Sequence, residues 1–247
     1  MSTRQKPRRL LKHQVYELLK SEDIENAFGE LCRLPLRQVV NSLFSFLYHS
    51  DPQVKWNAVT AMGIVTALLA KEDLETARII VRRLMWNLND ESGGIGWGSP
   101  EAMGEILANH ETLAHEYHQI LISYSREDGN FQENEIIQEE VLWGIGRLSQ
   151  NRPDLVKNSI SYLLPYLDSP NVALRGLATW IMGWVGMKEA EPKLEGLLQD
   201  EAEIRIYIDR KLVTRRIKDL AEEAIEKAKI LDARSWIRDP RYWVLDT

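Results

Sequence analysis

Apolar residues recur every three to four positions through most of this chain, which is the spacing of helices that bury one face. These helical patterns come in pairs. The first members are amphipathic stretches, which lie at Val39–His49, Ala77–Leu88, Glu111–Ser125 and Asp154–Leu167. The second members each carry a small or apolar residue followed five positions later by glycine, and they lie at Lys55–Gly63, Gly96–Gly104, Gln138–Gly146 and Arg175–Gly183.

The glycines that end the second segments are regularly spaced. Gly63, Gly104, Gly146 and Gly183 lie 41, 42 and 37 residues apart, a period typical of repeats built from two helices. A glycine inside a helix costs about 1 kcal/mol relative to alanine, so its recurrence needs a packing reason. We therefore predict that neighbouring second helices approach each other closely at these glycines.

Short breaks separate the two members of three pairs. They contain the dipeptides Asp51-Pro52, Ser99-Pro100 and Ser169-Pro170. Each places a residue suited to capping directly before a proline suited to the first helical turn. We expect a second helix to begin at each of these dipeptides.

The repeats resemble those of the HEAT-repeat superfamily. Leu163–Gly186 is most similar to its two-helix consensus, and Ser50–Gly63 is nearly as similar. The last unit, with Leu220–Ala228, looks like the closing repeat of bilin-lyase-type (PBS lyase) HEAT-like proteins. The resemblance covers residues 39–229 and implies an all-α fold, a right-handed HEAT-like α-solenoid of about five helical pairs.

One stretch breaks the helical period. Between residues 204 and 214, apolar and polar residues alternate, which places Ile204, Ile206 and Ile208 on one face of a strand. Residues 209–211 are suited to a turn. We predict a small β-hairpin, inserted in the last repeat of a single solenoid domain that spans residues 1–247.

Charge and the chain ends limit the partners. Residues 1–12 carry five basic residues and no acid, so the rest of the chain sums to −6 − 5 = −11. We expect a flexible basic arm at 1–12 and, because of its aromatic residues, a tail at 232–247 that folds back as a cap. An acidic body disfavours nucleic acid and favours a basic protein or peptide partner.

Few residues indicate the compartment. No apolar run approaches the length of a membrane span, and the first residues do not form a secretory signal. The single cysteine, Cys32, lies on an apolar stripe and fits a reducing environment. We expect a cytoplasmic protein that binds no membrane.

The most irregular segment is rich in glycine. Gly93, Gly94, Gly96 and Gly98 lie within six residues, beside Trp97. Such a loop can present backbone amides to a ligand, and the acids around it favour a cation, an amine or a basic peptide over phosphate. The alternative is a long turn that only lets two repeats pack.

Acidic and aromatic residues follow this loop at helical spacing. Glu101 and Glu105 lie four apart, and we expect them to face Glu139, Trp143 or Arg147 across a concave groove formed by the second helices. The alternative is a ladder of ion pairs between repeats.

One cluster invites a metal hypothesis. Glu111, His115 and His118 share a helical face, and His110-Glu111 and His115-Glu116 are superficially similar to the ligand dipeptides of deoxyhypusine hydroxylase, a di-iron HEAT-repeat enzyme. That face points away from the apolar stripe, which favours a solvated surface. We expect no metal and no other cofactor.

These observations favour a non-enzymatic protein-interaction scaffold. Its predicted binding site is an acidic and aromatic concave groove beside the loop Gly93–Gly98, and its predicted partner is a basic or extended segment. The alternatives are a ligand- or metal-binding HEAT enzyme, either bilin-lyase-like or di-iron-hydroxylase-like, and a HEAT-like DNA glycosylase. No nucleophile signature supports covalent catalysis.

Overall fold

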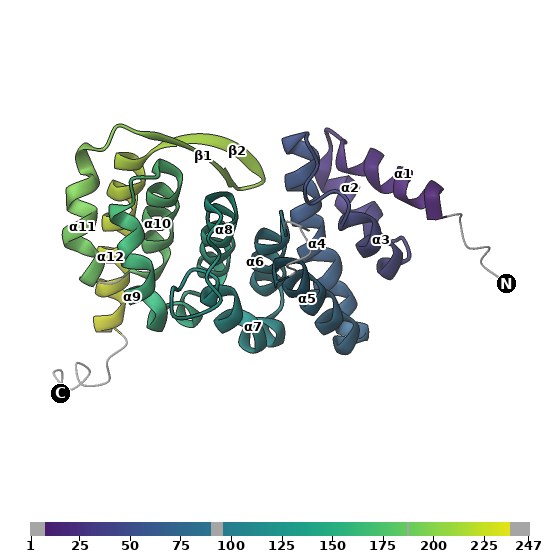
Figure 1. The fold of residues 1–247 in the computed structure, drawn as a ribbon, viewed down its shortest axis with the longest axis horizontal. Helices are drawn as coiled ribbons and strands as arrows, with labels where there is room; N and C mark the ends of the chain where they lie inside the picture. The colour runs from purple at the N-terminus through teal and green to yellow at the C-terminus, as the bar shows by residue number, and fades with distance from the viewer. Residues whose placement is uncertain (1–7, 90–95, 187, 238–247) are drawn as a thin grey trace, which may run out of the picture.

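A computed structural model describes residues 8–89, 96–186 and 188–237, with side chains described up to residue 230. Its helices stand side by side in one extended row, from α1 at one end to α11 and α12 at the other (Figure 1). The row opens with α1 (Arg8–Leu19) and α2 (Ile24–Leu31). These two helices precede the range in which the sequence predicts repeats.

Five helical pairs follow, as the sequence predicts. Their members are α3 (Leu36–Leu43) with α4 (Pro52–Glu72), α5 (Leu74–Asn89) with α6 (Ser99–Asn109), α7 (Glu111–Ser123) with α8 (Glu135–Asn151), α9 (Ile160–Leu163) with α10 (Val172–Val185), and α11 (Glu191–Gly196) with α12 (Ile217–Ile237). Short 3-10 turns flank α9 and α11 at Pro153–Leu155, Lys157–Ser159, Leu164–Asp168, Lys188–Ala190 and Leu197–Gln199. Prolines break up the α9 unit because they lack a backbone N–H.

The second helices α4, α6, α8, α10 and α12 pack in sequence against one another, and the repeated glycines lie in their seams. A Cβ added at Gly104 would lie 2.4 Å from Gly144 Cα, and one at Gly146 would lie 2.1 Å from the Trp180 ring. The prediction of close helix approach is confirmed.

Helices α4 and α6 begin at their predicted dipeptides and α10 begins just after its own, but two of the predicted capping residues need correction. Asp51 caps α4 as expected, since its carboxylate accepts from the N–H of Gln53 at 2.9 Å. Helix α6 is instead preceded by Gly98 in the left-handed conformation, at φ 78°. Helix α10 is capped by Asn171, whose side chain accepts two backbone N–H groups, rather than by Ser169.

Both predicted chain-end segments are wrong in part. Helix α1 begins at Arg8 and buries Leu11, so residues 8–12 form a helix instead of an arm. Residues 232–237 continue α12 instead of folding back. The remaining parts of these predictions, residues 1–7 and 238–247, lie outside the described residues.

The predicted hairpin is present, with slightly different limits. Strand β1 (Glu203–Ile208) pairs antiparallel with β2 (Lys211–Arg216). The turn has two residues rather than three, Asp209 and Arg210, with φ 49° and 62°. Positive φ at both turn positions is the geometry that matches the twist of paired strands. The hairpin arches over the helices, away from α11 and α12 and toward α4 (Figure 1).

Candidate functional site

The hairpin covers the inner side of the second helices. Ile204 packs on Gly176 of α10, and the Tyr207 ring stacks on Trp56 of α4 at a centroid distance of 4.6 Å. The Trp143 indole of α8 donates to the Tyr207 carbonyl at 2.9 Å. We call this surface the hairpin face. Trp143, one of the predicted groove residues, is therefore covered by the chain's own strand and is 3% exposed.

A cavity of about 210 Å³ remains beside the tip of the hairpin. Of the predicted site residues, Glu105, Trp143 and Arg147 line it. Glu105 is buried and accepts from Arg147 Nε at 2.9 Å and from Asn109 Nδ2 at 3.0 Å. Burial raises the pKa of Glu105, and Arg147 opposes that shift. The predicted contact between Glu105 and Arg147 exists, as an internal ion pair between α6 and α8.

Glu101 lies in a separate buried cluster. Lys55 Nζ is 3.0 Å from Glu101 Oε1 and 2.9 Å from Glu140 Oε1. Burial lowers the pKa of Lys55, but the two carboxylates outweigh burial and raise it. Burial and the Glu101 carboxylate raise the pKa of Glu140 to about 8. Lys55 and Glu140 were not among the predicted site residues, although a lysine within an apolar helix is a signal of such a cluster.

The described part of the glycine loop packs against the protein. The Gly98 N–H donates to Glu140 Oε2 at 2.7 Å, and a Cβ at Gly98 would lie 2.3 Å from the Leu47 carbonyl oxygen. A Cβ at Gly96 would lie 2.8 Å from the Asn87 carbonyl oxygen. Gly94 and Gly93 lie outside the described residues. The structure favours a packing turn for Gly96 and Gly98, because the Gly98 amide is already bound internally.

The predicted groove residues therefore do not converge on one open surface. Trp97 is 41% exposed, whereas Glu101 is 1% exposed. Glu139 is half-buried and accepts a hydrogen bond from Asn171 Nδ2 at 3.4 Å. Glu101 and Glu105, which were expected to face a partner, are buried between the second helices. There they form ion pairs between repeats, which was the alternative interpretation of these residues.

The residues of the candidate metal cluster do not converge either. Within the described ranges, no three His, Cys, Asp or Glu side chains are placed to hold a metal ion. Glu111 and His115 are exposed, and His118 Nδ1 lies 2.9 Å from the Ala114 carbonyl oxygen.

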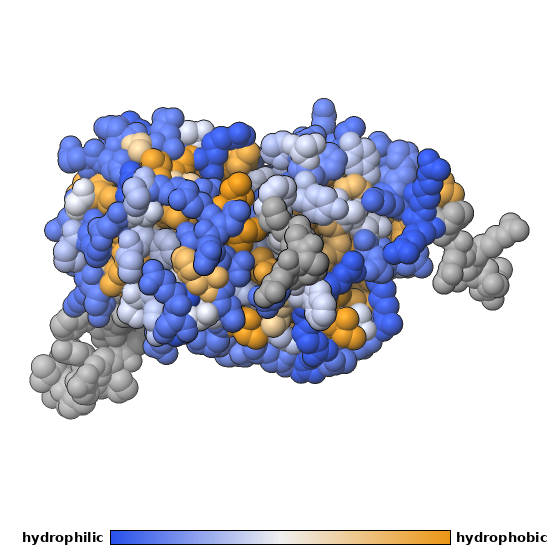
Figure 2. Space-filling view, in the orientation of Figure 1, coloured by the Kyte–Doolittle hydropathy of each residue, from blue (hydrophilic) through white to orange (hydrophobic). Residues whose placement is uncertain are grey.

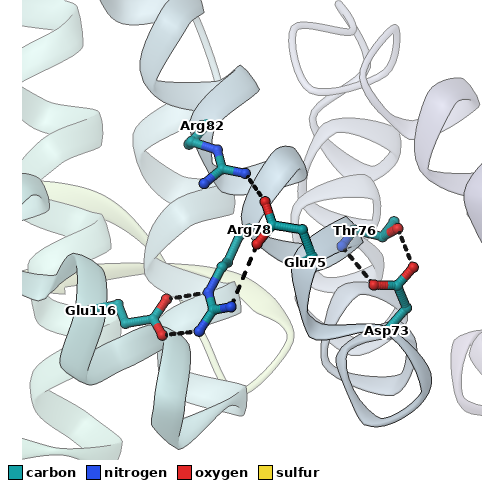
Figure 3. A network of polar contacts seen from close by, with 6 residues as sticks. All are labelled: Asp73, Glu75, Thr76, Arg78, Arg82 and Glu116. Atoms are coloured by element: carbon teal, nitrogen blue, oxygen red, sulfur yellow. Dashed lines mark hydrogen bonds and ion pairs between the residues drawn. The ribbon is translucent and has the colours of Figure 1, made fainter.

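Figure 3 shows that Glu116, of the second His-Glu dipeptide, is held by Arg78 of α5. The Arg78 Nε donates to Glu116 Oε2 at 2.8 Å, and Arg78 also contacts Glu75, which pairs with Arg82. This network lowers the pKa of Glu116 through its bond to Arg78. Glu116 thus ties the outer helices α5 and α7 together.

An open groove lies elsewhere, between the α7–α8 loop and the broken α9 unit. Its volume is about 660 Å³. Aromatic, proline and leucine side chains line it, namely Phe131, Tyr162, Pro165, Tyr166, Pro170 and Leu174. Acids share the lining, namely Glu127, Asp128, Glu135 and Asp168, with one base, Arg126. We call it the acidic groove. Its formal charge is 1 − 4 = −3 over these residues.

The walls of the acidic groove are held by internal bonds. The Tyr166 hydroxyl donates to the Ser125 carbonyl at 2.9 Å, and burial raises the pKa of Tyr166 to about 12. Arg126 donates to both oxygens of Asp128 and lies over the Tyr162 ring. Tyr162 is 36% exposed, so an aromatic surface stays open to solvent.

Two of the four groove acids are available for a partner. Asp128 is paired with Arg126, and Asp168 is paired with Lys193. Glu127 and Glu135 are exposed, and among the described residues Glu135 accepts a hydrogen bond from the Asn171 amide at 3.1 Å and pairs with no base. This groove was not predicted, because most of its lining comes from loops and 3-10 turns, which no helical period predicts.

Comparison with solved structures identifies the architecture. An engineered protein of known crystal structure aligns with a TM-score of 0.52 and 14% identity, over 89% of this chain and 96% of its own. A designed armadillo repeat protein in complex with the peptide (KR)4 aligns with a TM-score of 0.50 and 17% identity, over 88% and 99%. The fold is that of an armadillo-like repeat protein. At these identities the likeness establishes the fold alone.

Sequence comparison adds one relative. An uncharacterized protein of Archaeoglobus fulgidus is 24% identical over 190 residues, which are 75% of this chain and 95% of that protein. No family model matches the chain. The closer resemblance to bilin-lyase-type repeats stays a prediction.

Among the described helices of this armadillo-like protein, none combines the length and apolarity that a membrane span requires.

Proposed function

We propose that the protein is a non-enzymatic interaction scaffold that binds a basic segment of another protein in the acidic groove. The observation that carries the proposal is the groove itself. It is open, it has an aromatic and proline floor, and its exposed rim acids Glu127 and Glu135 lack an internal cationic partner among the described residues. The kind of partner is the one expected from the sequence, and the place is different.

The groove combines the two parts that a peptide site needs. Apolar side chains of a partner would pack on Phe131, Tyr162 and Pro165, where burial of apolar surface supplies most of the affinity. Lysine or arginine side chains would lie near the rim acids and set the register and orientation of the segment. One protein with this fold, the designed armadillo repeat protein, is in complex with the basic peptide (KR)4, which supports a basic peptide as the partner class.

A binding assay with a defined peptide tests the proposal. We expect fluorescently labelled (KR)4 to bind, and a version with one central leucine to bind more tightly because of the apolar floor. The double variant Glu127→Gln with Glu135→Gln removes the two available rim charges. It should weaken binding about five-fold, since each exposed ion pair contributes little by itself.

The matched control removes two exposed acids elsewhere, Glu111→Gln with Glu191→Gln, so that both proteins have the same net charge. Binding to this control should stay within about two-fold of the original protein. If both double variants weaken binding equally, the peptide is attracted by overall charge and the acidic groove is not its site. Tyr162→Ala should reduce the advantage of the leucine-bearing peptide.

A further inference from the structure

The hairpin differs in charge from the rest of the chain. Between Glu203 and Arg216 it carries five bases and two acids, a net charge of 5 − 2 = +3, in a chain of net charge −6. It lies extended across helices that are far apart in sequence. Its tip residue Arg210 pairs with Glu25 of α2 and lies over the Phe28 ring. The hairpin is therefore a basic, extended segment held along an inner solenoid surface.

The hairpin face holds this segment as a peptide-binding protein holds a ligand. The Trp143 indole donates to a backbone carbonyl, that of Tyr207, at 2.9 Å. The Tyr207 ring stacks on Trp56 with an interplanar angle of 5°, and its hydroxyl lies 3.3 Å from Thr60 Oγ1. Main-chain hydrogen bonds combined with pockets for alternate side chains are the usual means of recognising extended peptides.

The chain enters and leaves the hairpin at one point, while Ile204, Ile206 and Tyr207 along β1 are buried against the helices. The Ile217 N–H donates to the Ala202 carbonyl at 2.9 Å, and the Lys218 N–H donates to the Asp200 carbonyl at 3.0 Å. The two ends of the insertion thus meet, so the last repeat can close without it. A two-stranded hairpin is only marginally stable by itself, so its place on the solenoid depends on its contacts along β1 and at its tip.

We propose that the hairpin face is a receptor for an extended basic strand and that the hairpin is the ligand it holds in cis. The partner is a segment of another protein with alternating apolar side chains, an aromatic residue at the position of Tyr207, and basic residues on its outer side. Such a segment binds when the hairpin is lifted. This surface is separate from the acidic groove and does not depend on the function proposed for that groove.

The test separates the strand from its receptor. In one variant, residues 203–216 are replaced by two glycines, a length that the bond between Ala202 and Ile217 allows. The probe is a labelled synthetic peptide with the sequence of residues 203–216. We expect it to bind the excised protein and not the intact one, because a tethered hairpin competes at a millimolar effective concentration. Trp143→Phe in the excised protein should weaken binding about three- to ten-fold, by loss of the indole donor.

A scrambled peptide of the same composition is the control for charge, and it should not bind. Binding of the scrambled peptide with equal affinity overturns the proposal, and so does failure of a folded excised protein to bind the original peptide. The groove variant Glu127→Gln with Glu135→Gln should leave this binding unchanged, which keeps the two sites distinguishable.

A second variant serves if excision prevents folding. Arg210→Glu in the intact chain places a like charge against Glu25 and removes the contact with Phe28. The backbone amides of β1 and β2 should then exchange with deuterium faster, and the peptide of residues 203–216 should bind measurably. Unchanged exchange together with no peptide binding would show that the hairpin is a fixed part of the core.

Discussion

The hairpin face and the acidic groove contain the same kinds of residue in opposite states. Each combines aromatic rings with several carboxylates and an arginine. In the helices behind the hairpin face, Glu101 and Glu105 are 1% and 5% exposed and are paired with bases. In the groove, Glu127 and Glu135 are exposed, and no base pairs with them in the described part of the chain. The side chains alone do not decide which region is available to a partner.

Burial decides which of the two regions is available to a partner, because a buried charge loses its hydration. A carboxylate buried in a helix seam must find a cation or a proton, since an unpaired buried charge costs several kcal/mol. Lys55 and Arg147 meet that need from inside the molecule. An exposed carboxylate is stabilised by water and remains free for a partner's cation. Figure 2 shows a largely hydrophilic surface with scattered apolar patches, so charge at the surface is not itself unusual.

The largest effect should follow from removing the cation of the buried cluster. Lys55→Met leaves Glu101 and Glu140 without their shared ammonium, which should lower the free energy of unfolding by about 3–5 kcal/mol near pH 8. The loss should be smaller near pH 5, because the raised pKa of Glu140 keeps that carboxyl protonated there. Urea unfolding at both pH values measures it.

Glu135→Gln in the acidic groove is the matched comparison, and it should change stability by less than about 0.5 kcal/mol. A loss below about 1 kcal/mol for Lys55→Met at both pH values would contradict the contrast between the two regions. The buried acids would then be better solvated than their burial indicates.

A smaller effect should follow from adding one methyl group in a helix seam. Gly104→Ala would place a Cβ 2.4 Å from Gly144 Cα, so α6 and α8 must separate, at a cost of about 1–3 kcal/mol. Gly29→Ala is the control, because Gly29 lies in α2 and a Cβ there meets nothing within 4 Å.

The control Gly29→Ala should raise the free energy of unfolding by up to about 1 kcal/mol, because alanine has a higher helix propensity than glycine. Thermal unfolding of both variants compares a seam position with an open position. Equal melting temperatures for Gly104→Ala and the original protein would show that the seams are loosely packed.

Features that depend on local spacing could be predicted from the sequence. The helical pairs follow from apolar periodicity, and the close approach at Gly104 and Gly146 follows from glycines recurring at one register. The hairpin follows from alternation at Ile204, Ile206 and Ile208. Each of these signals lies within one repeat or between adjacent repeats, where chain distance and spatial distance agree.

Features that depend on distant contacts could not be predicted. Arg210 pairs with Glu25 across 185 residues, and Lys55 pairs with Glu140 across 85. Nothing in the spacing of these residues indicates that the hairpin reaches back over the solenoid. For that reason the sequence predicts an open concave groove where the structure has a covered one, and it misses the groove formed by irregular turns near Pro165.

The smallest effect, and the most specific, concerns the proton of the buried cluster. Burial and the Glu101 carboxylate raise the pKa of Glu140 to about 8, well above the ordinary value for glutamate. Between the ordinary pKa of glutamate and this raised pKa, Glu140 keeps a proton in the folded protein that it has lost in the unfolded chain. The free energy of unfolding should therefore fall as pH rises through that range. Glu101→Gln removes the negative neighbour, lowers the pKa of Glu140 and should flatten this slope, for a gain of about 1 kcal/mol near pH 8.

Glu203→Gln, an exposed change of the same charge, should leave the slope as it is. Parallel stability curves for Glu101→Gln and the original protein from pH 5 to 9 would mean that the two carboxyls do not share a buried environment, and the distinction between covered and open acids would lose its electrostatic basis.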